Sequence, residues 1–222
     1  MQELTSLRHL VRSYITEGIA NGTFCPGDKI SEQKISDALG ISRTPTREAM
    51  LQLNSEGLLD YFPRRGFFIR LMNEKEKNDI YEMLGLLDAY CAMTAVPKLT
   101  PKDLTRMREF TDKIDIAIKY LNLEEYGELQ RAFHQVYRAK CGNDMILAQI
   151  ANAESGIVPA TYVGDTPENL AQIYSLINEE HREVIRLLAA GDAVGVHQYL
   201  IQTHWAPRFP QLTRLRTHSA GE

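Results

Sequence analysis

One short run combines hydroxyl and arginine side chains just before an apolar helical pattern: Ser42-Arg43-Thr44-Pro45-Thr46-Arg47. A helix that enters the DNA major groove needs such side chains at its N-terminal end, where base edges and phosphates are nearest. Arg43 and Arg47 are one helical turn apart, and arginine suits bidentate contact with guanine. Ser42, Thr44 and Thr46 can donate to phosphates, and the helix N-terminus itself attracts anions. The run therefore predicts a base-reading helix.

A second basic feature follows about twenty residues later. Two short β-prone runs, 58–62 and 66–71, are joined by Pro63-Arg64-Arg65, which predicts a hairpin. Its tip, with Arg64, Arg65 and the permissive backbone of Gly66, would place two cations in a neighbouring minor groove.

The apolar spacing and the glycine positions around these residues predict the helices and strands that position them. Residues 4–19 have helical apolar spacing, and a short helix from Ser31 ends at Gly40. The helix that follows Ser42 and the hairpin complete the order of a winged helix-turn-helix. We therefore expect a DNA-binding domain over residues 1–72, made of three helices and a β-hairpin wing.

The rest of the chain has helical periodicity, interrupted at glycine and proline positions. The fold class is therefore mostly α, with an all-helical antiparallel bundle of six to seven helices over residues 73–210. A polar, flexible tail is expected over 211–222. The predicted helices cover 74–95, 101–120, 123–141, 143–157, 167–189 and 191–206.

Charge and composition narrow the class of protein. The net charge is −4, but residues 1–72 carry 9 Lys+Arg against 8 Asp+Glu, leaving 16 against 21 for the remainder. A locally basic face on an acidic body fits a specific DNA reader better than a non-specific one. Three scattered cysteines, the lack of a signal sequence and the lack of a long apolar run predict a cytoplasmic protein with reduced, mostly buried thiols and no membrane partner.

The N-terminal motifs resemble those of the GntR superfamily of bacterial regulators. The resemblance covers about residues 5–71 and is carried by four stretches: Pro26-Gly27-Asp28-Lys29-Ile30-Ser31-Glu32, Leu39 to Ala49, Glu56-Gly57-Leu58 and Pro63-Arg64-Arg65-Gly66. It implies that Arg43, Thr44, Arg47 and the wing-tip pair Arg65-Gly66 contact operator DNA. It also implies a homodimer that binds a short palindrome.

Residues 74–206 resemble the helical FCD domain of the FadR-type branch, through Asp79 to Met83, Phe133-His134 with Cys141-Gly142-Asn143, and Glu180-His181 with Gly191-Asp192. This resemblance implies a divalent metal, such as zinc or nickel, held by an Asp and three His. His134 and His181 match. Gln130 stands where the Asp is expected, and a carboxamide is a weaker ligand than a carboxylate. The third histidine is His204, one residue beyond the expected position, with His197 as the alternative.

The resemblance also implies a small-molecule effector, a carboxylate or a sugar acid, bound beside the metal. An arginine expected on the first long helix is replaced by Leu84, which removes one anchor for an acidic ligand. The cations and the amide that could take its place are Arg131, Arg138, Asn143 and Arg186.

Three functions are compatible with these observations. The first is a homodimeric regulator, a repressor, whose affinity for a double-stranded DNA operator changes when a metabolite binds. The second is a DNA-binding dimer with a degenerate sensor, which Gln130 and Leu84 keep open. The third is a metal-dependent enzyme in the helical bundle, but no triad order, Walker loop or HExxH spacing is present. We therefore expect no enzymatic activity.

Overall fold

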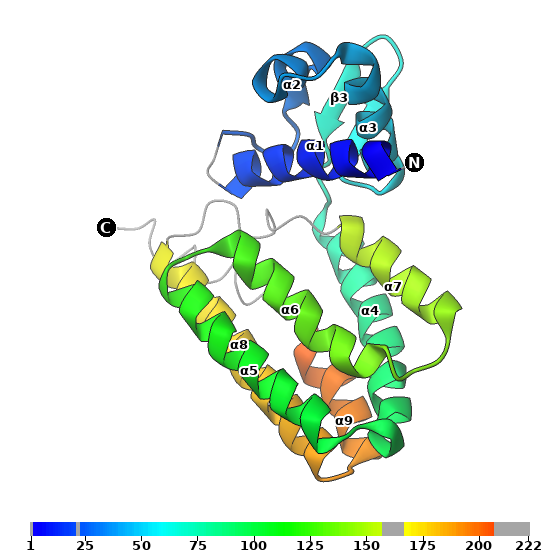
Figure 1. The fold of residues 1–222 in the computed structure, drawn as a ribbon, viewed down its shortest axis with the longest axis vertical. Coiled ribbons are helices and arrows are strands. Elements are labelled where there is room, and N and C mark those ends of the chain that lie inside the picture. Colours follow the sequence, from blue (N-terminus) through cyan, green and yellow to red (C-terminus); the bar gives the residue numbers. More distant parts are fainter. Residues whose placement is uncertain (1, 21–22, 157–166, 207–222) are drawn as a thin grey trace. The chain divides into compact units, whose positions relative to one another are not determined.

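The computed structural model describes residues 2–20, 23–156 and 167–206, and these are predominantly helical with one small sheet (Figure 1). The chain divides into two compact units. The first contains Met1–Leu71 and also the segment that begins at Ala151, and the second contains Met72–Ile150 and the chain from Pro167 onward. The expected tail, 211–222, lies outside the described residues.

The first unit begins with three helices, α1 (Gln2–Ala20), α2 (Glu32–Leu39) and α3 (Arg43–Ser55). Ser31 caps α2, because its hydroxyl accepts a hydrogen bond from the backbone N–H of Lys34 at 3.0 Å. Gly40 ends α2 with a φ of +66°, a left-handed conformation that glycine adopts without strain. The chain can therefore turn sharply into α3.

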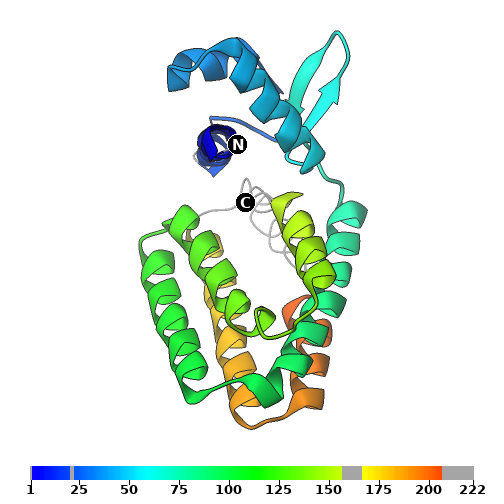
Figure 2. The same ribbon diagram turned by 45° about the vertical axis from the view of Figure 1, so that its right-hand side comes forward.

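A three-stranded antiparallel sheet completes the first unit, in the order β1-β3-β2 (Figure 2). Its strands are β1 (Lys29–Ile30), β2 (Leu59–Phe62) and β3 (Gly66–Ile69). The predicted hairpin is β2 and β3, while β1 was not predicted. The apolar side chains of helices and sheet form one buried core: Val11, Ile15, Ile19, Phe24, Ile30, Ile35, Ala49, Met50, Leu53, Leu58, Leu59, Phe67 and Ile69.

The second unit is a helical bundle. It contains α4 (Glu74–Ala95), a 3₁₀ turn (Val96–Lys98), α5 (Pro101–Lys119), α6 (Leu123–Arg138), the first part of α7 (Asp144–Gly156), α8 (Pro167–Ala189), α9 (Ala193–Tyr199) and a π-helix (Leu200–His204). The last residues of α7, from Ala151 on, belong to the first unit. Capping boxes start two of these helices, through Asn73 and Glu76 for α4 and through Thr100 and Asp103 for α5. The mostly helical fold with an N-terminal winged helix-turn-helix is thus confirmed.

The packing of this bundle brings distant parts of the chain together. α5 packs against α6 and α8, and α4 packs against α6, α9 and the π-helix (Figure 1). The face of α6 that carries His134 and the face of α8 that carries His181 are buried inside the bundle, and so are Leu200 and His204 of the π-helix. No helix among the described residues is both long enough and apolar enough to cross a membrane.

Candidate nucleic-acid interface and metal centre

The N-terminal turn of α3 exposes part of the predicted DNA-reading run. Ser42, Arg43 and Thr44 are all exposed, and Arg43 has no hydrogen bond or ion pair within the described part of the chain. Ser42 is the N-cap residue, as expected, but its side chain makes no capping hydrogen bond. The hydroxyl of Ser42 and the guanidinium of Arg43 are therefore available to an external partner.

Thr46 has a different role from the one predicted. Its side chain is fully buried. Its hydroxyl accepts from the Ser36 hydroxyl at 3.0 Å and donates to the backbone carbonyl of Ser42 at 2.9 Å. These two bonds join α2 to the start of α3. Because the hydroxyl proton of Thr46 is already donated inside the domain, it cannot be donated to a phosphate. The expected DNA contact of Thr46 is corrected to a structural role.

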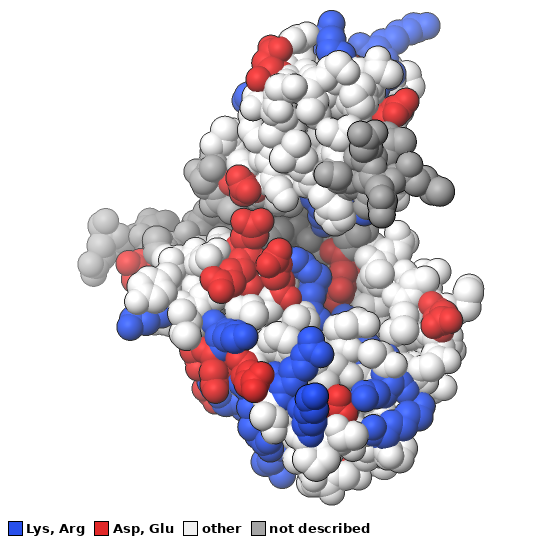
Figure 3. All heavy atoms as spheres, in the orientation of Figure 1, with Lys and Arg blue, Asp and Glu red and all other residues white. Residues whose placement is uncertain are grey.

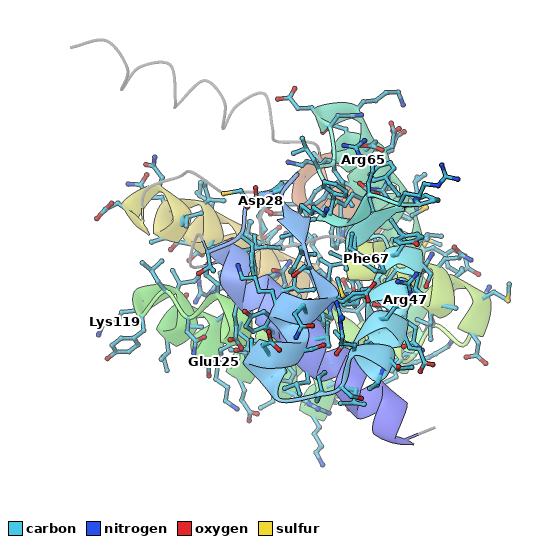
Figure 4. The ribbon with its side chains drawn as sticks, turned by 90° about the horizontal axis from the view of Figure 1, so that it is seen from above. Asp28, Arg47, Arg65, Phe67, Lys119 and Glu125 are labelled. Atoms are coloured by element: carbon cyan, nitrogen blue, oxygen red, sulfur yellow. The ribbon has the colours of Figure 1, made fainter. Side chains whose placement is uncertain are left out.

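Arg47 remains on the surface but is held by its own domain. Its guanidinium donates to Glu32 at 2.7 Å and to the Tyr61 hydroxyl at 3.2 Å, and it lies 5.7 Å from the centre of the Tyr61 ring. These contacts join α2, α3 and β2 around one cation. Figure 4 shows Arg47 on α3 and Arg65 on the hairpin.

The wing tip places both expected arginines in solvent. Arg64 and Arg65 are exposed, and the chain turns there with φ of +66° at Arg64 and +95° at Gly66. The Arg65 guanidinium lies over the rings of Phe62 and Phe68, whereas Arg64 has no such ring contact among the described residues. In Figure 3, basic side chains extend from the upper part of the first unit. The visible face of the second unit carries acidic and basic side chains mixed together.

Inside the bundle, three histidines from different elements converge. His134 of α6, His181 of α8 and His204 of the π-helix each offer a ring nitrogen, and these atoms all lie within 4.8 Å of one another. The Nε2 atoms of His134 and His204 are 3.3 Å apart. The three side chains are 1%, 0% and 7% exposed, so water does not screen them.

Each of these histidines is oriented by a separate oxygen. The Nδ1 of His134 lies 3.1 Å from Asp88 Oδ2, that of His181 lies 3.3 Å from Asn178 Oδ1, and that of His204 lies 3.1 Å from Glu180 Oε2. An acceptor at Nδ1 places the ring proton on that nitrogen and leaves the Nε2 lone pair free. The three rings therefore present their lone pairs to a common point.

The amide of Asn178 is itself fixed. Its Nδ2 donates to the Thr111 carbonyl at 2.9 Å and to Asp115 at 2.7 Å, so its oxygen must face His181. The Nε2 of His181 is a buried polar atom without a hydrogen-bond partner in the part of the chain that the structure describes. Because an unpaired buried polar atom is costly, this nitrogen indicates a missing ligand.

Burial disfavours the protonated form of two of these rings, His134 and His181. It lowers the pKa of His134 to about 4, and the nearby Arg138 adds to that effect against the opposing Asp88. Burial also lowers the pKa of His181 well below its ordinary value, with His204 and His134 contributing. Neutral imidazoles are the form that binds a metal.

The donor set fits a divalent transition metal. Three neutral imidazole nitrogens with room for further ligands are a common arrangement for zinc or nickel. In a tetrahedral site with metal–nitrogen bonds of about 2.1 Å, neighbouring nitrogens are about 3.4 Å apart. The His134–His204 pair already has this separation. Gln130 lies one helical turn before His134 and is half-buried, and His197 is outside the cluster among the described residues.

Asp88 is the central acceptor beside this cluster. Besides His134, it accepts from the Tyr137 hydroxyl at 2.7 Å, from Arg138 Nε at 2.6 Å and from the Trp205 indole at 2.8 Å. Burial alone would raise the pKa of this carboxyl, but Arg138 and then His134 hold it well below its ordinary value. Asp88 therefore stays charged and joins α4, α6 and the C-terminal segment.

The π-helix explains the spacing of His204. In a π-turn, one extra residue is inserted into the helical ladder, and here the N–H of Trp205 donates to the carbonyl of Leu200 at 2.9 Å. The insertion shifts the following side chains by one position. His204 is consequently buried at the cluster, and Thr203, at the expected position, is only half-buried.

Most of the residues expected to anchor an effector lie elsewhere. Arg186 is exposed and paired with Glu183 at 2.6 Å, and Arg131 is exposed on α6. Asn143 is exposed and accepts from the N–H groups of Met145 and Ile146, which caps α7. Among the described residues, none of these three side chains has a hydrogen bond or ion pair to the histidines, and their role as effector anchors stays a prediction. Of the four, Arg138 alone is buried beside the histidines.

Comparison with known proteins gives a consistent result for both halves of the chain. The family model described as bacterial regulatory proteins, gntR family, matches residues 7–69, and the FCD domain model matches residues 79–205. An HTH-type transcriptional regulator in an unstable DNA locus of Streptomyces ambofaciens is 30% identical over 199 residues, covering 87% of this chain and 80% of that protein. The chain belongs to the GntR family.

Other members of the GntR family extend this comparison. The Nta operon transcriptional regulator of Aminobacter aminovorans is 26% identical, with coverage of 75% of this chain and 76% of that protein. The solved structure of Escherichia coli McbR/YncC has the same fold, with a TM-score of 0.74, 21% identity and coverage of 95% and 98% of the two chains. The protein is thus a GntR-type DNA-binding transcriptional regulator with an FCD effector-binding domain, and it is not an enzyme.

Sequence reasoning missed the orienting residues of this GntR regulator. Asp88 is 46 residues from His134, and no local pattern connects them. Asn178 is three residues before His181, on the same helix face, which is a weak signal. Glu180 is next to His181 in the chain but orients His204 instead.

Proposed function

We propose that this regulator is a homodimeric repressor that binds a palindromic operator and is released by a small acidic metabolite. The DNA-binding part rests on the exposure of Ser42, Arg43 and Thr44 at the start of α3, where Arg43 has no partner among the described residues. The proposed contacting set is Ser42, Arg43, Thr44, Arg47, Arg64, Arg65 and Gly66.

Each member of this set has a distinct expected partner. Arg43 reads a base edge in the major groove, where arginine discriminates guanine. Ser42 and Thr44 donate to phosphates beside the helix N-terminus. Arg64 and Arg65 enter the adjacent minor groove from the wing. Arg47 is already held by Glu32 and Tyr61. It therefore presents its charge to the DNA backbone with little further loss of rotamer freedom on binding.

The sensor is proposed to hold one divalent metal, zinc or nickel, through His134, His181 and His204. Three converging imidazoles with separate orienting oxygens support this proposal. Such an ion supplies positive charge and open coordination positions for a carboxylate. Arg138 is buried nearby, but its charge is balanced by Asp88, so the positive charge that a carboxylate would meet would come from the ion. A carboxylate or sugar acid is therefore the proposed effector class.

A thermal-melt screen tests the sensor. The protein is stripped with chelator and heated with zinc or nickel, alone and together with small organic acids, sugar acids or amino acids. A compound present at a hundred times its dissociation constant adds about 2.7 kcal/mol to the free energy of unfolding. Trp205, the single tryptophan, donates to Asp88 beside His134, so its fluorescence gives a second signal of metal binding.

Two variants make the screen specific. His181→Phe keeps the buried ring volume and removes the unpartnered Nε2, so metal-dependent stabilisation should be lost. His197→Ala changes a histidine outside the cluster and should leave it intact. Stabilisation by acids without metal would contradict the metal site. No stabilisation by any compound, with DNA binding intact, would indicate the degenerate sensor.

A further inference from the structure

The outer face of the wing carries two phenylalanines where a small sheet ordinarily exposes polar residues. Residues alternate between the two faces of each strand, and Phe67 and Ile69 of β3 point into the core. Phe68 therefore lies on the outer face, half-buried, and Phe62 at the end of β2 is 45% exposed. The first unit does not need either ring for its core.

These two rings form one aromatic surface. Their centroids are 5.6 Å apart and the ring planes meet at 73°, an edge-to-face arrangement. Phe62 pairs with Gly66 across the hairpin, and Phe68 pairs with Asp60, so the sheet register holds the rings side by side. The two rings therefore lie next to the turn that forms the wing tip.

Arg65 lies over this surface. Its guanidinium carbon is 5.6 Å from the centre of the Phe62 ring and 5.3 Å from that of Phe68, both within the range of a cation–π contact. The turn fixes its backbone as well, because the N–H of Arg65 donates to the carbonyl of Phe62 at 3.0 Å. Both the main chain and the side chain of Arg65 are thus restrained before any DNA is bound.

We propose that Phe62 and Phe68 are positioning residues for DNA binding, which hold the Arg65 guanidinium in the geometry that enters the minor groove. The inference rests on the proposed DNA contact of Arg65. A restrained arginine loses less conformational freedom when it binds than a free one. It also reads groove width more sharply, because a narrow minor groove admits one direction of approach.

The neighbouring cation supplies an internal comparison. Arg64 is equally exposed and carries the same charge, but it has no ring contact among the described residues. A cross-strand aromatic pair would also stabilise the hairpin. Hairpin stabilisation would support both arginines equally, whereas positioning affects Arg65 alone. Double variants can therefore distinguish the two roles: positioning predicts that the rings affect DNA affinity through Arg65 alone, and hairpin stabilisation predicts an effect through both arginines.

The test uses the full-length protein and a duplex that the wild-type protein selects from a random-sequence pool. Affinity is measured by fluorescence anisotropy at several salt concentrations for Phe62→Leu, Phe68→Leu, Arg65→Ala and Arg64→Ala, alone and in pairs. We expect each leucine variant to weaken binding about three- to fivefold, as an exposed cation–π contact predicts. Phe68→Tyr keeps the aromatic ring and should therefore bind the duplex with wild-type affinity.

The pairs decide the mechanism. In the Arg65→Ala background, either leucine substitution should have no further effect, while in the Arg64→Ala background its full effect should remain. Equal loss in both backgrounds would overturn the proposal in favour of hairpin stabilisation, which a lowered midpoint of thermal unfolding would accompany. If Arg65→Ala itself leaves affinity unchanged, the DNA contact of Arg65 fails, and the positioning role fails with it.

Discussion

At the scale of single residues, Arg43 is distinguished from Arg47 by its lack of internal partners. Arg47 donates to Glu32 and Tyr61, while Arg43 has no partner in the described chain. A side chain without internal bonds gives its full hydrogen-bonding capacity to a ligand. We therefore propose different functions for the two arginines of α3: Arg43 reads bases, whereas Arg47 joins α2, α3 and the wing and presents its charge to the DNA backbone.

Arg43→Ala should weaken operator binding by about 1–3 kcal/mol and relax base preference at one position of each half-site. The measurement is anisotropy with the selected duplex and with duplexes changed at single positions. Glu48→Ala is a suitable control, because Glu48 is exposed on the same helix and is not among the proposed contacts. Unchanged affinity for Arg43→Ala at moderate salt would show that α3 is not the reading helix.

Asp88 is the residue on which the interior of the sensor depends. It takes four hydrogen bonds, from His134, Tyr137, Arg138 and Trp205, while fully buried. An unpaired buried charge is far more costly than the loss of a surface pair. The arrangement is therefore sensitive to removal of the carboxylate charge.

Asp88→Asn should lower the free energy of unfolding by about 3–5 kcal/mol, because it leaves the Arg138 guanidinium buried without its anionic partner. Urea unfolding followed by circular dichroism measures the change. Asp79→Asn removes an exposed partner of Lys75 and should cost less than about 1 kcal/mol. Equal stability of Asp88→Asn and the wild type would mean that Arg138 finds another acceptor.

At the scale of elements, strong periodicity and terminal signals made most helices predictable. The expected helix 74–95 coincides with α4, and 167–189 coincides with α8. Besides the 3₁₀ turn Val96–Lys98, two elements escaped prediction. β1 has two residues and exists because Gly27 and Asp28 exchange backbone hydrogen bonds with Ile69, a partner some forty residues away. The π-helix has no sequence signature of its own, since packing decides where an extra residue is absorbed.

The candidate sites were predictable to the extent that local sequence, and not long-range packing, determines them. Arg43 and the wing arginines could be found because their types and local spacing suit DNA. Thr46 could not be told from Thr44, because its burial depends on Ser36 in another helix. The three histidines were found through the family resemblance, but Asp88 and Asn178, which orient two of them, are set by tertiary packing.

Deletion of Gln202 tests the π-helix as a device that corrects register. Removing one exposed residue from the inserted turn should convert it to an α-helix and keep the histidine facing His134 and His181. Zinc affinity by calorimetry should then remain within about threefold of the wild type, because the histidine keeps its hydrogen bond to Glu180. Deleting both Gln202 and Thr203 rotates the histidine by about 100° and should abolish binding. Loss of affinity in the single deletion, with the fold intact by circular dichroism, would contradict this explanation.

At the scale of the whole molecule, the proposed repressor needs two DNA-binding domains, because a single recognition helix contacts only a few bases. A symmetric pair of heads requires a palindrome whose half-sites are about one DNA turn, roughly 34 Å, apart. An effector changes affinity only through a different preference for the DNA-competent and incompetent arrangements of that pair. The proposed repressor mechanism therefore depends on the distance between half-sites.

Inserting five base pairs between the half-sites should reduce affinity to that of a single half-site, because half a turn places them on opposite faces of the duplex. The comparison is made by anisotropy with the selected palindrome, the lengthened duplex and an isolated half-site. Light scattering of the protein alone and of the complex gives the number of copies bound. If the lengthened duplex binds as tightly as the palindrome, the two heads act independently, and an effector that reorients them could not control DNA binding.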